Sequence, residues 1–188
     1  MTTSNTLISI PPDGILTNRL EFGKGEIVYF SNIPLGTHVF ERLISGQIDM
    51  SSSTKVDLIS IRKNIGHIND DNYLWSSLSA KENLELYLES IGMRSASNQE
   101  FVNRLGIEWT KKVDNLEVTQ RHLLQIAIGL SKDPEIILYD STSVHTSLPI
   151  YNKIMSVLYN LVKDKGLTLL SNISSSDLIE RYPGRIIE

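Results

Sequence analysis

Short apolar runs and amphipathic segments alternate along this chain. The apolar runs predict strands at 7–10, 15–22, 26–30, 56–61, 65–68, 135–140, 167–170 and 185–187. Apolar residues at helical spacing predict helices at 37–45, 79–91, 98–105, 119–131, 147–165 and 177–181. The runs at 26–30 and 135–140 are nearly continuous, which is typical of strands buried on both faces of a parallel sheet.

Local signals mark the ends of several elements. Ser79 and Glu82 form a capping-box pattern, Thr119 is a candidate cap for the helix that follows it, and Pro149 lies in a first helical turn. The order of elements predicts an α/β domain with a mixed sheet, helices on both faces and a helical insertion of roughly 50 residues. We expect one domain over 1–188, with a core at 1–68 and 134–188 and a helical subdomain at about 69–133.

Composition excludes several classes of site. Of 188 residues, 40% are hydrophobic and none is cysteine, so disulfides, zinc–thiolate sites and cysteine nucleophiles are absent. The net charge is -4, whereas a dedicated nucleic-acid-binding domain more often carries a basic excess. No apolar stretch approaches the roughly 18 residues of a membrane span, and residues 1–6 show no basic and apolar leader pattern. The sequence is typical of a soluble or peripheral protein that binds no nucleic acid.

Four segments occur in an order that carries a family resemblance. Ser31–His38 lies between a predicted strand and helix, 65–70 precedes the helical insertion, and Leu116–Arg121 leads into the helix before Lys132–Glu135. A buried strand then ends at Asp140. In this order the segments resemble the phosphate loop, Q-loop, signature and Walker B strand of the nucleotide-binding domain of ABC transporters. The resemblance implies a P-loop NTPase-like ABC cassette fold and, in active members, ATP and Mg²⁺ as ligands.

The phosphate loop departs from the pattern G-x-x-x-x-G-K-[ST]. It keeps Gly36, but Pro34 has no N–H to donate to a phosphate. Thr37 stands at the lysine position and removes a positive charge. His38 stands at the Mg²⁺-binding hydroxyl, and imidazole is a poor ligand for that hard ion. These positions therefore predict a degenerate phosphate loop.

The remaining positions of the family's site are also altered. Asp140 matches the Walker B carboxylate and is a candidate metal ligand, but Ser141 stands at the catalytic glutamate. Gln120 matches the signature glutamine. The two residues before it are β-branched, whereas the family has glycines at those positions. Asp70 stands at the Q-loop glutamine and Ser174 at the expected histidine. No aromatic residue precedes Phe22 to stack on adenine.

Each singled-out residue also has a plainer interpretation. Asp140 is more simply a cap for the loop that follows it, and His38 a polar residue in a first helical turn. Trp75 follows the Q-loop position, where the family meets the coupling helix of its membrane partner. It is either an interface anchor together with Asp70, or a ring packed under the helical subdomain. The other histidines show no metal-ligand spacing.

The leading hypothesis is a catalytically silent, ABC ATPase-like subunit that acts as a scaffold or docking subunit of a membrane transporter complex. It would bind no cofactor, and its partners would be a transmembrane subunit, another cassette subunit, or both. One alternative is a low-efficiency ATPase subunit of an exporter, such as a haem-handling cytochrome c maturation system, with ATP and Mg²⁺. Another is a structural subunit of an unrelated membrane assembly. The location expected is peripheral to a membrane, in the cytoplasm or an organelle matrix.

Overall fold

The fold contains two sheets and a set of helices. The computed structural model describes residues 6–47, 49–50, 64–69, 74–96, 99–140, 148–172 and 175–188. The strands are β1 (Thr6–Ile10), β2 (Leu20–Gly23), β3 (Ile27–Phe30), β4 (Asp49–Met50), β5 (Ile65–Asn69), β6 (Ile136–Asp140), β7 (Thr168–Asn172) and β8 (Arg185–Ile187). The helices are α1 (Ile33–Ser45), α3 (Ala80–Ser90), α4 (Gln99–Arg104), the 3-10 turn η1 (Val113–Asn115), α5 (Val118–Leu130), α6 (Leu148–Lys165) and α7 (Ser176–Arg181).

The core sheet is parallel throughout. Its strand order is β5-β6-β7-β3-β8, and each neighbouring pair runs in the same direction. The N-terminal strands form a separate antiparallel sheet, β2-β1-β4. The predicted α/β class is confirmed, but the antiparallel strands do not join the core sheet, because β8 occupies the edge beside β3. The predicted division of the domain at 68–69 and 133–134 stays a prediction.

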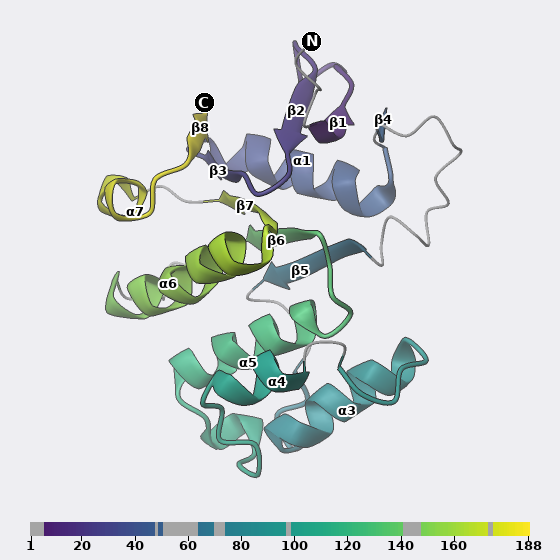
Figure 1. The fold of residues 1–188 in the computed structure, drawn as a ribbon, viewed down its shortest axis with the longest axis vertical. Coiled ribbons are helices and arrows are strands. Elements are labelled where there is room, and N and C mark those ends of the chain that lie inside the picture. Colours follow the sequence, from purple (N-terminus) through teal and green to yellow (C-terminus); the bar gives the residue numbers. More distant parts are fainter. Residues whose placement is uncertain are drawn as a thin grey trace.

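Alternation along the core strands supplies two apolar layers. One face contacts α1 and the N-terminal sheet through Val28, Phe30, Ile136, Leu138 and Leu170. The other contacts the α5 and α6 side through Ile27, Tyr29, Ile137, Tyr139 and Leu169. Figure 1 shows the N-terminal sheet and the helices α3–α5 at opposite ends of the molecule, with the core sheet between them. The carboxyl ends of β3, β6 and β7 therefore meet at one edge, where ligands of open α/β sheets bind.

Three predicted boundaries are wrong. The strand expected at 15–22 is only Leu20–Gly23, because Asp13 Oδ1 accepts from the backbone N–H groups of Ile15 and Leu16, both at 2.8 Å, and holds them in a turn. The helix expected from residue 37 begins at Ile33. The N-cap of α5 is Glu117 rather than Thr119. The capping box at α3 is confirmed, whereas the strand expected at 56–61 lies outside the described residues.

Candidate functional site

The turn from β3 into α1 occupies the place of the predicted phosphate loop. Only two residues separate the strand from the helix, because α1 begins at Ile33. Asn32 caps the helix: its side-chain oxygen accepts from Leu35 N at 3.2 Å, and its carbonyl accepts from Gly36 N at 3.0 Å. Two backbone donors of the first turn are therefore used within the chain. Pro34, in the same turn, contributes none.

His38 faces the N-terminal segment. Its Nε2 lies 2.9 Å from Asp13 Oδ2, and Arg42 Nη1 lies 2.9 Å from the same oxygen. Arg42 also donates to the carbonyl of Pro11 at 2.7 Å. The backbone N–H of Leu16 first, and then His38, hold the pKa of Asp13 well below its usual range. The residue at the family's magnesium position thus ties α1 to the loop after β1, and Thr37 lies beside it within the helix.

Asp140 contacts an amide. Asn172 Nδ2, at the end of the neighbouring strand β7, donates to Asp140 Oδ1 at 2.8 Å. Asn172 is buried, and its other amide atom, Oδ1, lies against Gly36. A Cβ added to Gly36 would meet that oxygen at 1.7 Å. The Asn172 amide therefore touches both the retained Walker B carboxylate and the retained glycine of the phosphate loop.

The structure brings some predicted site residues together and leaves others apart. Gly36 and Asp140 meet through Asn172 at the carboxyl edge of the core sheet. Asp70, Ser141 and Ser174 lie outside the described residues. Within the described ranges, no group of three or more His, Asp or Glu side chains is arranged to hold a metal ion.

Gln120 is engaged by a neighbouring loop. Its Oε1 accepts from Glu108 N at 2.9 Å, and its Nε2 donates to Gly106 O at 3.0 Å. Arg121, the next residue, donates to the carbonyls of Asp114 and Leu116. The segment that matches the signature thus holds the 106–116 loop against the start of α5.

A groove of about 430 Å³ lies between the core sheet and the helical subdomain, and we call it the α3–β5 groove. Side chains of α1, β5, α3 and α5 and of the segment before α3 line it. They are Ile44, Ile65, His67, Leu74, Trp75, Asn83, Leu86, Tyr87, Ser90, Ile128, Gly129 and Lys132. Most of this lining is apolar. The groove has the position that the family resemblance gave to the partner surface, and it contains Trp75.

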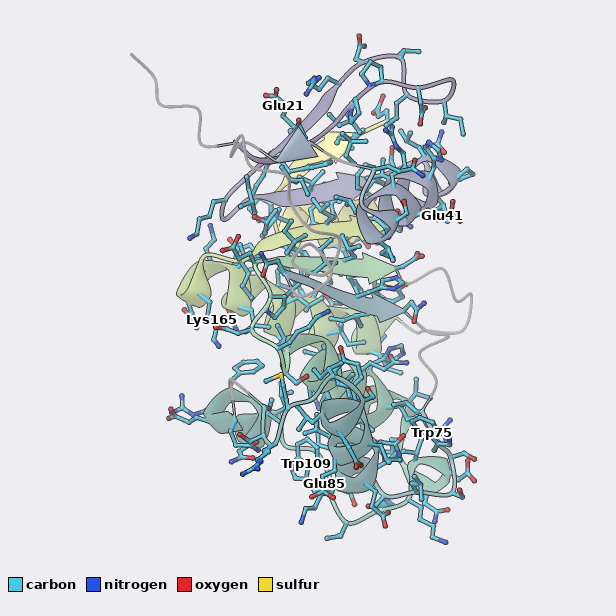
Figure 2. All side chains as sticks on the ribbon, turned by 90° about the vertical axis from the view of Figure 1, so that its right-hand side faces the viewer. Glu21, Glu41, Trp75, Glu85, Trp109 and Lys165 are labelled. Carbon is cyan, nitrogen blue, oxygen red and sulfur yellow. The ribbon has the colours of Figure 1, made fainter. Side chains whose placement is uncertain are left out.

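Trp75 has a fixed backbone and an exposed ring. Its N–H donates to Asn83 Oδ1 at 2.7 Å, and its carbonyl accepts from Asn83 Nδ2 at 3.0 Å. Asn83 is itself buried on α3. The tryptophan residue is nevertheless 55% exposed, so it is not packed under the helical subdomain. Figure 2 shows Trp75 on a different side of the helical part from Trp109 and Glu85.

Two basic groups share the groove. His67 lies on β5 opposite Leu138, and Lys132 follows the end of α5. Burial lowers the pKa of the Lys132 ammonium below its usual value. Burial first, and then the charge of Lys132, lower the pKa of His67, against an opposing effect of the Asp140 charge. Both groups are thus partly dehydrated.

Known proteins resemble the chain in sequence and in fold. No protein-family profile matches it. It is 27% identical over 170 residues to the methionine import ATP-binding protein MetN of Haemophilus ducreyi. The alignment covers 87% of this chain and 49% of MetN. It is 27% identical over 162 residues to the phosphonates import ATP-binding protein PhnC of Lactiplantibacillus plantarum, covering 76% of this chain and 63% of PhnC.

Solved structures agree on the fold. The cbiO1 protein of Clostridium perfringens, part of an ABC transporter complex, superimposes with a TM-score of 0.74 at 17% identity, over 95% of this chain and 82% of cbiO1. The ATP-binding cassette MJ0796, solved as a dimer with ADP and phosphate, gives 0.67 at 23% identity, over 97% of this chain and 91% of the cassette. The chain is a distant ABC nucleotide-binding domain.

This nucleotide-binding domain spans about half the length of MetN. Both curated relatives are, by name, ATP-binding proteins of import systems. No helix among the described residues of the domain is long and apolar enough to cross a bilayer.

Several contributors to the site escaped sequence reasoning. Asn32 is the N-cap of α1, and the Asn-x-Pro pattern at a strand end is a signal that would have found it. Asn172 had a weaker signal, as a polar residue ending a buried strand next to the Asp140 strand. Nothing in the sequence points to the contact between Asp13 and His38, which are 25 residues apart.

Proposed function

We propose that this nucleotide-binding domain is a catalytically silent subunit, which keeps the ABC cassette fold as a scaffold and docks on a membrane partner. The observation that carries the proposal is the closed turn between β3 and α1. A phosphate loop needs several free backbone N–H groups around the anion. Here Asn32 accepts from two residues of that turn, and Pro34 has no N–H.

The residues at the site do not fit Mg-ATP. Thr37 supplies no charge to a β- or γ-phosphate, and His38 already faces Asp13. The Asp140 carboxylate accepts from the Asn172 amide, and we propose this structural role for it in place of metal binding. Each lost charge-assisted hydrogen bond costs about 1.5–3 kcal/mol, and two or three such losses weaken binding by at least about a hundredfold.

Calorimetry and an ATP hydrolysis assay test whether the site binds or hydrolyses Mg-ATP. We expect no measurable heat of Mg-ATP binding and no ATP hydrolysis above a buffer control. The double variant Thr37→Lys, His38→Ser should also stay inactive, because Ser141 cannot act as a base. Hydrolysis by the wild-type protein that is abolished in Asp140→Asn would overturn the proposal. It would favour the second candidate, a low-efficiency ATPase, which the names of the curated relatives support.

The docking role has support of its own. The α3–β5 groove is apolar, and it presents a tryptophan whose backbone is held by a buried asparagine. Exposed aromatic anchors of this kind carry much of the energy of protein interfaces. A subunit docked in this way would lie peripheral to a membrane, on the side of the cytoplasm or an organelle matrix.

Capture from native membranes tests the docking role. Tagged wild-type protein should retain a transmembrane transporter subunit, and Trp75→Ala should lose it. Ile186→Ala is a matched control, because Ile186 is also exposed and apolar but lies on β8. Equal recovery by wild type and Trp75→Ala would refute docking through the groove. Stable capture of non-transport membrane subunits would favour the alternative of an unrelated assembly.

A further inference from the structure

Asn83 uses both polar atoms of its amide on the segment that carries Trp75. Its Oδ1 accepts from the Trp75 N–H at 2.7 Å. Its Nδ2 donates to the carbonyls of Trp75 at 3.0 Å and of Ser79 at 2.9 Å. The Asn83 residue is 2% exposed, so water reaches these bonds only when the start of α3 opens. Because unmade bonds of buried polar groups are costly, this amide fixes the backbone of the turn before α3.

A second set of hydrogen bonds ties the same turn to η1. The Ser76 carbonyl accepts from Asp114 N at 3.1 Å. The Leu78 carbonyl accepts from Val113 N at 2.9 Å. Leu78 N in turn donates to the Trp75 carbonyl at 3.2 Å and closes the turn. The backbone of Trp75 is thus held within the chain itself, before any partner arrives.

The ring of Trp75 is left for a partner. The residue is 55% exposed, although its backbone is held from two sides. Loops and side chains that become ordered on binding reduce affinity, and an anchor that is already in place avoids much of that cost. Asn83 borders the α3–β5 groove but is almost fully buried, so it offers a partner little surface of its own. Any contribution of Asn83 to docking must therefore act through Trp75.

We propose that Asn83 is a positioning residue for docking, which holds the Trp75 turn in the conformation that the partner meets. This inference rests on the docking role proposed above and adds the residue that preorganises it. Trp75 supplies the contact, and the Asn83 amide determines where the ring is presented.

Three variants of the full chain separate positioning from general stability. Asn83→Ala removes all three amide bonds. Asn83→Asp keeps an acceptor for the Trp75 N–H, but its carboxylate cannot donate to either carbonyl. Ser79→Ala is the matched control, because it weakens the capping box at the same helix start and leaves the Asn83 bonds intact, which use only the Ser79 backbone.

Two measurements follow the turn and the docking separately. Amide hydrogen exchange reports whether the Trp75 N–H is still protected. Capture from native membranes reports how much is recovered of the transmembrane subunit that wild type retains. In Asn83→Ala we expect exchange at Trp75 to be about tenfold faster and recovery to be about tenfold lower, as for the loss of one buried hydrogen bond. Ser79→Ala should recover the subunit within about twofold of wild type.

The Asn83→Asp variant adds a rescue that a merely structural role would not produce. Its new carboxyl group would be buried and would face two carbonyl oxygens, and both effects raise its pKa. The protonated form can donate to one of those carbonyls, whereas the ionised form cannot. Relative to wild type at the same pH, recovery should be poor at pH 8 and rise at least about threefold at pH 5.5. Recovery by Asn83→Ala should show no such rise.

The unfavourable outcomes distinguish this inference from the docking role. Unchanged exchange at Trp75 in Asn83→Ala, or faster exchange with undiminished recovery, would overturn the positioning role and leave docking in place. An equal loss of recovery in Ser79→Ala, or no rescue of Asn83→Asp at pH 5.5, would also overturn it, because the effect would then be one of stability. If Trp75→Ala recovers as much of the subunit as wild type, or wild type recovers none, the docking role itself fails and the positioning role falls with it.

Discussion

Replacing Gly36 by alanine should destabilise the domain, although alanine is the better helix former. In α1 the change alone would favour the helix by about 1 kcal/mol. The new Cβ, however, would lie 1.7 Å from Asn172 Oδ1 and 2.8 Å from Phe30 Cβ. Neither separation is possible without movement, so the Asn172 side chain must leave its place.

The size of the effect follows from what that movement breaks. Displacing Asn172 removes its hydrogen bond to the Asp140 carboxylate, worth about 1.5–3 kcal/mol for a charged acceptor. Overpacking against β3 adds about 1–3 kcal/mol. After the gain in helix propensity, we expect the free energy of unfolding to fall by about 1.5–5 kcal/mol. The melting temperature should fall by roughly 3–20 °C.

Urea unfolding followed by circular dichroism measures this difference. Gly14→Ala is the control, because a Cβ at Gly14 meets nothing within 4 Å. In the Gly36→Ala background, Asn172→Ala should cost less than it does in wild type, because it removes the colliding group. If Gly36→Ala is as stable as wild type, the tight contact between α1 and β7 is not a feature of the molecule in solution.

Three further variants test other contacts. Asp13→Asn should be less stable than wild type at pH 7. Because the pKa of Asp13 is depressed in the folded state, this difference in stability should persist above about pH 4 and shrink as the pH falls below it. Urea unfolding midpoints measured across pH would test this dependence. Ser79→Ala removes one side of a capping box and should cost about 0.5–2 kcal/mol of stability in the same assay, with no change in helix content. Gln120→Ala should speed amide hydrogen exchange at Glu108, and unchanged protection there would contradict the role given to this side chain.

Elements whose signals are local were the ones that the sequence predicted best. The capping box at Ser79, the buried strand ending at Asp140 and the terminal strand β8 each occur as expected. The start of α1 was missed, because apolar residues at helical spacing marked the helix only from residue 37, whereas Asn32 and Pro34 begin it at Ile33. The cap and the proline are local signals that the apolar spacing does not include.

Features of the site that depend on contacts between residues far apart in the sequence could not be predicted from the sequence. The Asn172 amide contacts Asp140 and Gly36 only because β7 lies beside β6 and packs near α1. The exposure of Trp75 depends on Asn83, which holds the backbone while leaving the ring outside. Neither relation leaves a periodic pattern in the chain, so hydrophobic spacing could not reveal it.

The position of β3 between β7 and β8 has a consequence for how the chain is made. Ser31, just after β3, donates to the carbonyl of Ile187, 156 residues further along the chain. At about 5–20 residues per second, synthesis of that intervening stretch takes roughly 8–30 s. For most of that time the apolar residues of β3 have neither of their strand neighbours. The pairing of β3 on both sides is therefore complete only after residues 185–187 have been synthesised.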